Sequence, residues 1–439
     1  MTTERLVALS FLGVILTGAL LLTLPISSKT GDFTAFSDCL FTATSATCVT
    51  GLVVVDTFTH WSVFGQLVVL LLIQIGGLSF MTLITIFAIF TKKHISLKEM
   101  NILTQSAGNV RRDAVITLIK GIIFGTLIVE ATGTLFLSFC LCPEVGAKGV
   151  YYAMFHSVSA FCNAGFDLMG FKGEFSSLTS YVDNVAVNSI IMVLIVVGGL
   201  GFFVWTDLIK CKFRFKKLEM HSKIVISTTA VLILFGAVCF FIFEYAHSLK
   251  DLPLGDKILA SFFQSVTTRT AGFNTIDQSA LSDSGKLTSV FLMITGGSPG
   301  STAGGIKTTT LAVIIISTIA GASNHENSVI FKKKIAAESI KQAHTIATTY
   351  IIFAVVSTCL ICAFEPHIPL SDILFEVASA IGTVGLTTGI TPTLSEASKI
   401  VLMILMYAGR LGAMTLMLVL SERHSKVPLD RPSEKVIVG

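Results

Sequence analysis

Long apolar runs alternate with short polar segments along the whole chain. Eight of these runs meet or approach the ~20 residues that cross a bilayer as a helix. They comprise residues 6–24, 64–90, 115–141, 185–206, 224–243, 290–319 with an interruption, 346–364 and 400–420. The first run is long for the apolar core of a signal peptide, and no small-residue cleavage site stands out before Pro25. The pattern therefore predicts an all-α membrane protein with eight spanning helices.

Four shorter helical segments lie between successive pairs of spanning runs. They are residues 33–47, 149–162, 255–268 and 371–381. Each is too short to cross a bilayer, and each ends just before small residues and a glycine. Backbone without helical hydrogen bonds survives at membrane depth only where protein covers it or where it lines a wet cavity. We therefore expect each segment to dip into the membrane and return as extended chain.

One sequence pattern recurs at these segments, about every 110 residues. A phenylalanine stands ten residues before a glycine, and a leucine or phenylalanine follows that glycine directly. A fixed long period is typical of a repeated structural unit. It predicts four tandem membrane-pore-membrane repeats around a pseudo-fourfold pore. The predicted repeats are 1–91, 112–212, 222–320 with a broken second spanning helix, and 340–422, followed by a cytoplasmic tail, 423–439.

The residues leading to each glycine are candidate cation ligands through their backbone carbonyl groups. Moving an ion out of water costs on the order of tens of kcal/mol unless other ligands replace its hydration shell. Rings of carbonyl groups replace it for K⁺, and the C-terminal ends of the short helices favour a cation nearby. The alternative is that these glycines serve helix packing alone. The predicted filter residues are Cys48, Val49, Thr50, Gly51, Cys162, Asn163, Ala164, Gly165, Arg269, Thr270, Ala271, Gly272, Gly382, Thr383, Val384 and Gly385.

A glycine-rich segment interrupts the sixth apolar run. Proline removes a hydrogen-bond donor and glycine disfavours helix, so the break must face protein or water. We interpret it as a flexible gate below the filter, with a passive kink as the alternative. A phosphate-binding loop is excluded because Ile306 separates the last glycine from the lysine. The predicted gate residues are Gly296, Gly297, Ser298, Pro299, Gly300, Ser301, Thr302, Ala303, Gly304, Gly305 and Lys307, together with Arg410.

Arg410 lies in the middle of the last apolar run. A buried arginine costs at least ~2.5–3.5 kcal/mol on insertion scales, so this side chain should face a cavity and have partners. The carbonyl groups of the helix break are candidates. We interpret Arg410 as a positive barrier in the pore; the alternative is an internal hydrogen-bond donor without a functional role. Lys307 either joins the gate or extends to the cytoplasmic surface. Glu130 and His156 are interpreted as core polar groups with satisfied hydrogen bonds.

Basic residues are concentrated on one side of the predicted membrane. Charged residues make up only 13% of the chain, against roughly 25% in soluble proteins. The side that holds the termini carries 21 Lys and Arg residues, and the opposite side carries 8, with 16 acidic residues. The positive-inside rule therefore places both termini in the cytoplasm. The basic connections 92–112, 210–223 and 331–341 would contact anionic lipid or dock a cytosolic partner.

Signatures of catalysis are missing from the sequence. It contains neither a His-Glu-x-x-His motif nor an aspartyl-phosphate pump motif. Ser298 and Ser301 have no base placed by spacing, and the nine scattered cysteines have no histidine cluster beside them. The chain is therefore predicted not to be an enzyme, and its cysteines to be structural thiols.

The chain resembles the superfamily of K⁺ transporters that contains the Trk, Ktr and plant HKT proteins, most of all the bacterial Ktr membrane subunit (KtrB-type). The resemblance covers nearly the whole chain. It rests on residues 45–52, 163–166, 269–274, 382–387, 74–78 and 409–412. It implies a homodimer in the cell membrane with one pore per protomer, and a cytosolic RCK ring (KtrA-type) that alone binds nucleotide. It implies no nucleic-acid partner.

The resemblance also implies K⁺ as the transported ion, with Na⁺ as a possible activator. The family's filter glycines map onto the four glycines above, its gating loop onto residues 296–307 and its pore-blocking arginine onto Arg410. Some relatives with serine at the first filter glycine favour Na⁺, so Gly51 favours K⁺. Pro299 departs from the family pattern and would stiffen the loop. The alternative function is a Na⁺-selective or obligatorily Na⁺-coupled transporter.

Overall fold

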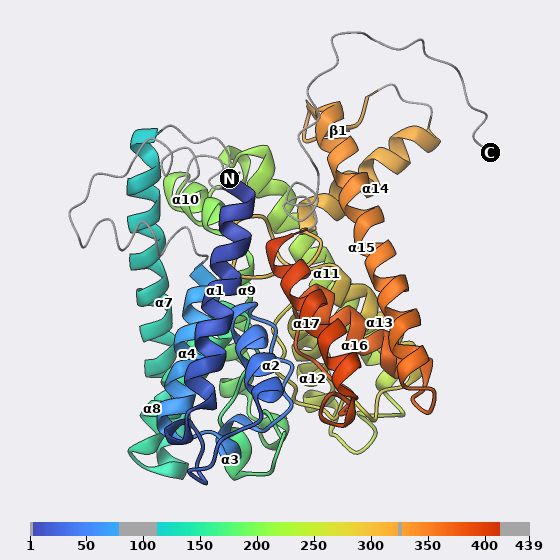
Figure 1. The fold of residues 1–439 in the computed structure, drawn as a ribbon. Coiled ribbons are helices and arrows are strands. Elements are labelled where there is room, and N and C mark those ends of the chain that lie inside the picture. Colours follow the sequence, from blue (N-terminus) through green and yellow to red (C-terminus); the bar gives the residue numbers. More distant parts are fainter. Residues whose placement is uncertain (1–2, 79–111, 324–326, 413–439) are drawn as a thin grey trace.

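The computed structural model describes residues 3–78, 112–323 and 327–412, and within them the chain is mostly helical (Figure 1). Many of the long helices run side by side from one end of the molecule to the other. Two-residue strands, β1 (Val329–Ile330) and β2 (Lys333–Lys334), form one antiparallel hairpin. Helix α3 (Thr57–His60) and five 3₁₀ turns connect the other helices: Pro25–Ser27, Met169–Phe171, Thr179–Tyr181, Phe215–Lys217 and Thr391–Thr393.

Three stretches of the described helices are long and apolar enough to cross a membrane. They are Gly121–Val145 within α7 (Arg112–Val145), α11 (Met220–Glu244) and α15 (Ala337–Phe364). Shorter apolar helices are found in α1 (Thr3–Thr23), α4 (Val63–Leu78) and α14 (Thr308–Ala322). The predicted runs 64–90 and 400–420 continue outside the described residues, so eight spans remain a prediction.

One predicted span is bent. Helices α9 (Val185–Gly199) and α10 (Phe202–Lys210) meet at 94°, so the apolar run 185–206, which was predicted as one spanning helix, forms two helices. Gly201 has a φ of +90°, a conformation that glycine adopts without steric cost. The Phe202 N–H donates to the Gly300 carbonyl oxygen at 2.9 Å, outside its own helix. The bend thereby joins this helix pair to the glycine-rich segment.

The four short helices lie close to their predicted positions. They are α2 (Phe36–Thr47), α8 (Lys148–Cys162), α12 (Leu254–Thr267) and α16 (Leu370–Gly382). Each packs against the longer helix that precedes it in the chain. Their C-terminal halves are mostly buried, which is the arrangement that short apolar helices need in order to exclude water.

The phenylalanine ten residues before the recurring glycine is buried in three of the short helices, but not in α12. Phe41, Phe155 and Phe375 are fully buried. Phe262, at the same distance from its glycine, is 36% exposed, and the neighbouring Phe263 is buried instead. Sequence spacing alone did not reveal that the third short helix turns a different face to the core.

Glycine allows two of these helix pairs to approach closely. In the α7–α8 pair, a Cβ atom on Gly133 would overlap the Oγ of Ser157, which donates to the Glu130 carbonyl oxygen at 2.8 Å. In the α11–α12 pair, a Cβ atom on Gly236 would overlap the Oγ of Ser265. The same glycine–serine contact thus fixes two short helices against their neighbours.

Glu365 connects the end of α15 to the start of α17 (Glu396–Leu411). Its Oε1 accepts from the Ser395 N–H at 2.8 Å and from the Ser398 hydroxyl at 3.0 Å. Hydrogen bonds from Ser395 and Ser398 hold the pKa of Glu365 below its ordinary value. Because the folded-state pKa is lowered, this contribution to stability is present above the ordinary pKa and is lost as pH falls through the lowered one.

Replacing Gly133 with alanine should destabilise the protein. The new methyl group would overlap Ser157 and lie 2.9 Å from both δ carbons of Leu194, and overpacking of this kind costs about 1–3 kcal/mol. Gly121→Ala, in the same helix, is the control because nothing lies within 4 Å of its added Cβ. Thermal unfolding in detergent should give a lower midpoint for Gly133→Ala alone. Equal midpoints for the two variants would contradict this packing.

Candidate functional site

The four predicted filter segments share an uncommon backbone conformation. The residue two places before each glycine has a positive φ, which non-glycine residues rarely adopt. These values are 56° for Val49, 59° for Asn163, 69° for Thr270 and 52° for Thr383, and the four glycines themselves have φ between 72° and 98°. Such conformations cost on the order of 1–3 kcal/mol each and persist only where the surrounding structure imposes them.

The four glycines pack against one another in a closed order. A Cβ atom on Gly51 would lie 2.5 Å from the Ala164 carbonyl oxygen, directly before Gly165. One on Gly165 would lie 2.9 Å from the Ala271 oxygen, and one on Gly272 would lie 2.5 Å from the Val384 oxygen. One on Gly385 would overlap the Thr50 oxygen, which closes the order. Segments separated by more than 100 residues therefore meet backbone to backbone, with no room for side chains between them.

Hydrogen bonds tie three of these segments back to their short helices in the same way. The N–H groups of Thr50, Ala164 and Val384 each donate at 2.8 Å to the carbonyl oxygen of a serine five residues earlier. Side chains of two of these serines, Ser45 and Ser379, also accept from the N–H of Gly51 and Gly385 at 3.0 Å. In the third segment Ala271 instead bonds to the carbonyl of Thr267, four residues back.

The remaining filter residues are buried around these backbones. Cys48 and Cys162 are fully buried, and the side-chain amide of Asn163 hydrogen-bonds the Thr270 hydroxyl at 3.2 Å. Arg269 is 6% exposed, and its guanidinium lies 3.5 Å from the Thr229 hydroxyl, behind the segment. The hydroxyl oxygens of Thr50 and Thr383 have no hydrogen-bond partner among the described residues. All nine cysteines are free thiols.

Three glycines that follow the filter segments allow a second set of close contacts. A Cβ atom on Gly76, Gly198 or Gly409 would overlap a backbone carbonyl oxygen. These oxygens belong to Thr47, Phe161 and Ile381, each four residues before a filter glycine. These three glycines follow Gly51, Gly165 and Gly385 by 25, 33 and 24 residues, so no common spacing in the sequence indicated their packing role.

The glycine-rich segment runs from the end of α13 (Asp283–Ile294) to Thr308, the first residue of α14, without forming a helix. Backbone hydrogen bonds join its two ends. The Gly296 N–H donates to the Ile306 oxygen at 2.8 Å, and the Ile306 N–H donates to the Ile294 oxygen at 3.1 Å. The Ser298 N–H bonds to the Gly199 oxygen, at the bend between α9 and α10.

This segment also touches the filter segments. The Thr302 hydroxyl donates to the Phe161 oxygen at 3.1 Å, at the end of the second short helix. A Cβ atom on Gly304 would overlap the side chain of Thr383. The predicted break in the sixth run is therefore present, and it lies against two of the four filter segments.

The two cations of the predicted gate bind backbone carbonyl groups. The Arg410 guanidinium donates to the oxygens of Thr302, Gly76 and Gly77, so it connects the glycine-rich segment to the end of α4. The Lys307 ammonium donates to Ala303 at 2.6 Å and to Gly304 at 3.3 Å. Lys307 thus finds its acceptors within its own loop.

Glu130 and His156 have the satisfied hydrogen bonds that were expected. The Gln74 amide donates to the Glu130 carboxylate at 3.1 Å. The Nδ1 of His156 lies 2.7 Å from the Tyr152 oxygen, and its Nε2 lies 3.3 Å from the Leu168 nitrogen.

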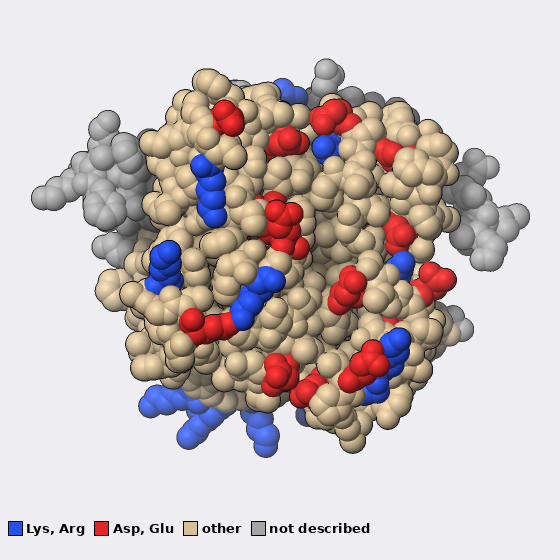
Figure 2. All heavy atoms as spheres, turned by 90° about the horizontal axis from the view of Figure 1, so that it is seen from below, with Lys and Arg blue, Asp and Glu red and all other residues tan. Residues whose placement is uncertain are grey.

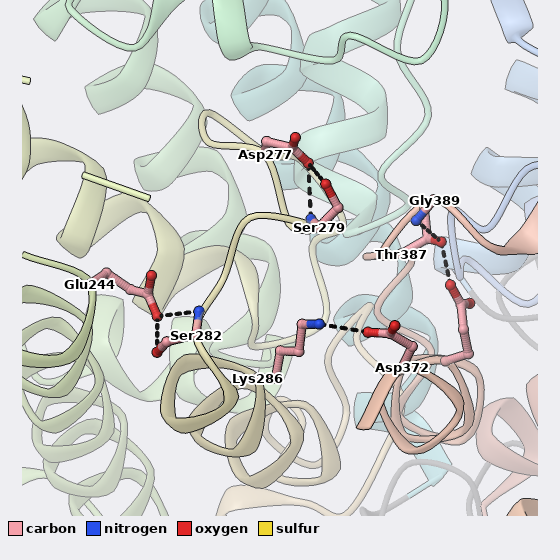
Figure 3. Close-up of polar contacts among 9 residues, drawn as sticks. Glu244, Asp277, Ser279, Ser282, Lys286, Asp372, Thr387 and Gly389 are labelled. Atoms are coloured by element: carbon pink, nitrogen blue, oxygen red, sulfur yellow. Dashed lines mark hydrogen bonds and ion pairs between the residues drawn. The ribbon is translucent and has the colours of Figure 1, made fainter. Parts of the chain in front are cut away.

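Acidic side chains are spread over the face opposite the β1–β2 hairpin, shown in Figure 2. Several are engaged with basic groups or backbone. Lys286 pairs with Asp372 at 2.7 Å, and Glu244 accepts from both the N–H and the hydroxyl of Ser282 (Figure 3). Glu244 also accepts from the Ser248 hydroxyl. These contacts connect the end of α11 to the start of α13, and α13 to the start of α16.

Comparison with known proteins agrees with this architecture. The family model of TrkH, described as a cation transport protein, matches residues 5–427. The chain is 39% identical to the potassium/sodium uptake protein NtpJ of Enterococcus hirae, over 99% of this chain and 97% of that protein. It is 39% identical to the Ktr system potassium uptake protein B of Bacillus subtilis, over 94% and 92%.

The fold is also similar to a solved structure. The crystal structure of the potassium transporter TrkH from Vibrio parahaemolyticus aligns with a TM-score of 0.72 and 18% identity, over 94% of this chain and 84% of that one. At this identity the likeness supports the helical membrane-protein fold. The family match spans nearly the whole sequence, and the chain belongs to the TrkH family of cation transport proteins.

Proposed function

We propose that this chain is the K⁺-conducting membrane subunit of a bacterial Ktr-type K⁺ uptake system. Four membrane-pore-membrane repeats would surround a pseudo-fourfold pore. K⁺ would pass a filter of backbone carbonyl groups and then an intramembrane gate. Names of relatives from two bacteria, which refer to potassium uptake, support the proposed substrate.

The observation that carries this proposal is the closed order of contacts among Gly51, Gly165, Gly272 and Gly385. Four chain segments in one conformation, each against the carbonyl of the next, bring many peptide oxygens close together. Carbonyl groups so arranged can replace the water that K⁺ loses. The short helices add the negative ends of their dipoles at the same place.

Arg410 and the glycine-rich segment support a gate below this filter. A guanidinium held at the filter's inner side repels a cation, and water-poor surroundings strengthen that repulsion. Its contacts are to backbone carbonyl groups of two different elements. Movement of the segment would therefore move the positive charge with it.

Assembly and location complete the proposal. The chain would lie in the cell membrane with both termini in the cytoplasm, as a homodimer that a cytosolic nucleotide-binding RCK ring regulates. The basic stretch 210–217, with Phe213 76% exposed, and the β1–β2 hairpin offer surface for such a partner or for anionic lipid. Phe215 and Phe331 are in edge contact, which makes the two surfaces continuous.

A second candidate is a transporter that is Na⁺-selective or obligatorily coupled to Na⁺. The observation that favours it is the name of the Enterococcus relative, which includes both ions. Gly51 favours K⁺ selectivity over this alternative. Transport is the proposed activity in both cases, with no catalytic step.

Gly385→Ala should abolish K⁺ uptake, whereas Gly389→Ala should keep it. The two glycines have nearly the same φ, 91° and 92°, so the backbone strain of an alanine is matched. Only at Gly385 would the methyl group overlap the next segment. Both variants should be expressed in a bacterium that lacks K⁺ uptake, with and without a ring partner, under K⁺ and Na⁺ titration. Equal loss in both variants would contradict the role of the glycine contacts.

Gly51→Ser should lower the ratio of K⁺ to Na⁺ uptake several-fold. A serine Cβ there would push on the Ala164 carbonyl and change the position of a predicted ligand. Gly31→Ser is the control, because Gly31 also has a positive φ, +77°, but nothing lies within 4 Å. Uptake of both ions measured side by side gives the ratio. If the ratio stays at the wild-type value, the filter assignment of this segment fails.

Arg410→Gln should increase K⁺ flux several-fold, and Arg410→Lys should increase it less. Glutamine removes the positive charge, whereas lysine keeps a positive charge but cannot reproduce the forked contacts of the guanidinium with three carbonyl oxygens. Reconstitution into vesicles with a K⁺ gradient measures the flux directly. Identical flux in all three proteins would rule out an electrostatic barrier at this position.

A further inference from the structure

Glu376 is a buried carboxylate directly behind the fourth filter segment. It lies nine residues before Gly385, in α16, and it is 1% exposed. Its Oε1 accepts from the Thr387 hydroxyl, and its Oε2 accepts from the Thr391 hydroxyl at 3.1 Å. The Thr388 N–H also hydrogen-bonds this carboxylate. One side chain therefore holds three residues that follow the filter glycine.

The threonines extend this network to the backbone. Thr387 Oγ1 accepts from the Gly389 N–H at 2.9 Å (Figure 3), and it lies 2.9 Å from the Thr391 hydroxyl oxygen. The segment from 387 to 391 begins two residues beyond Gly385. Its conformation thus depends on a single carboxylate.

His156 occupies the equivalent position in the second repeat. It lies nine residues before Gly165 and is 1% exposed. Its Nε2 accepts from the Leu168 N–H at 3.3 Å. Leu168 is three residues after Gly165, just as Thr388 is three residues after Gly385. Two side chains of different chemistry therefore bind the same backbone position in two repeats.

The other two repeats lack this contact. Thr42 and Phe263 stand nine residues before Gly51 and Gly272. Phe263 has no polar group, and the buried hydroxyl of Thr42 has no hydrogen-bond partner among the described residues. In the closed order of glycine contacts, Gly165 and Gly385 are not successive. The segments that follow Gly165 and Gly385, which carry these contacts, are therefore opposite each other in the closed order.

We propose that Glu376, with His156 opposite, is a positioning residue that fixes the extracellular end of the filter and thereby sets K⁺ over Na⁺ selectivity. This inference rests on the proposed function. Backbone carbonyl ligands cannot adjust independently of the chain, so their spacing depends on what holds the chain on each side. Side chains that position such ligands must keep them within about 0.5 Å of the productive geometry.

Direct ion binding by Glu376 is a poorer explanation. Both carboxylate oxygens already accept hydrogen bonds from threonines, and the side chain is buried. Asp372, one turn earlier in α16, is paired with Lys286 at 2.7 Å (Figure 3). No group of three acidic, histidine or cysteine side chains suited to a metal ion exists within the described ranges.

The experiment compares Glu376→Ala, Glu376→Gln and Thr387→Val with Glu365→Gln. Glu365 is a matched control, since it is also buried, at 4% exposed, and hydrogen-bonds Ser395 and Ser398 away from the filter. K⁺ and Na⁺ uptake are measured in a bacterium that lacks K⁺ uptake, with KM and maximal rate determined separately. Membrane levels of each variant are measured in parallel.

Glu376→Ala should lower the K⁺ to Na⁺ uptake ratio at least fivefold and raise the KM for K⁺, with the maximal rate within twofold of wild type. Glutamine should restore part of the ratio, because its oxygen can still accept one hydrogen bond. Thr387→Val should shift the ratio in the same direction. A shift in this variant and in Glu376→Gln supports the proposal even if Glu376→Ala fails to reach the membrane.

Two results would overturn the inference in distinguishable ways. If wild type takes up K⁺ and Gly385→Ala does not, but all Glu376 and Thr387 variants at normal membrane levels keep the wild-type ratio, Glu376 is structural only. The same conclusion follows if Glu365→Gln changes the ratio as much as Glu376→Gln does. If wild type takes up neither cation, the proposed function fails, and this inference fails with it.

Discussion

Four stretches of non-helical backbone meet at van der Waals distance inside a largely apolar helical protein, and the rest of the structure depends on this contact. An uncovered peptide group at membrane depth costs several kcal/mol. Here the N–H groups bond back to the short helices, as those of Thr50, Ala164 and Val384 do. Carbonyl oxygens of the same residues lie against glycines of the neighbouring segments. Only glycine permits that approach.

The helices around this contact serve to hold it in place. Each short helix packs against the longer helix before it, and in two pairs a glycine–serine contact brings the helices close together. Helices α4, α9 and α17 present Gly76, Gly198 and Gly409 to the carbonyl groups at the ends of the short helices. Small residues thus recur wherever backbone must approach backbone, as is common between membrane helices.

Acidic and basic groups near the four recurring glycines have different kinds of partner. Acidic groups such as Asp372 and Glu244 are engaged with lysine, serine or backbone partners. Arg410 and Lys307 bind carbonyl groups of the glycine-rich segment and of α4. Neither cation forms an ion pair with a carboxylate among the described residues. Within the described part of the chain, backbone carbonyl dipoles are the partners of both positive charges.

The sequence by itself determined the short helices, the four recurring glycines and the interruption at residues 296–307, because length, apolar content and glycine spacing are local properties. It also indicated that Arg410 needs partners. Only the tertiary structure decided the order in which the glycines meet, the bend at Gly201, the burial of Phe263 in place of Phe262, and the carbonyl groups that Arg410 and Lys307 bind. These features join residues far apart in the chain. A periodic sequence pattern determines which face of a helix can be buried or where a turn can form. Which residue that face or turn contacts is decided only by packing between distant segments.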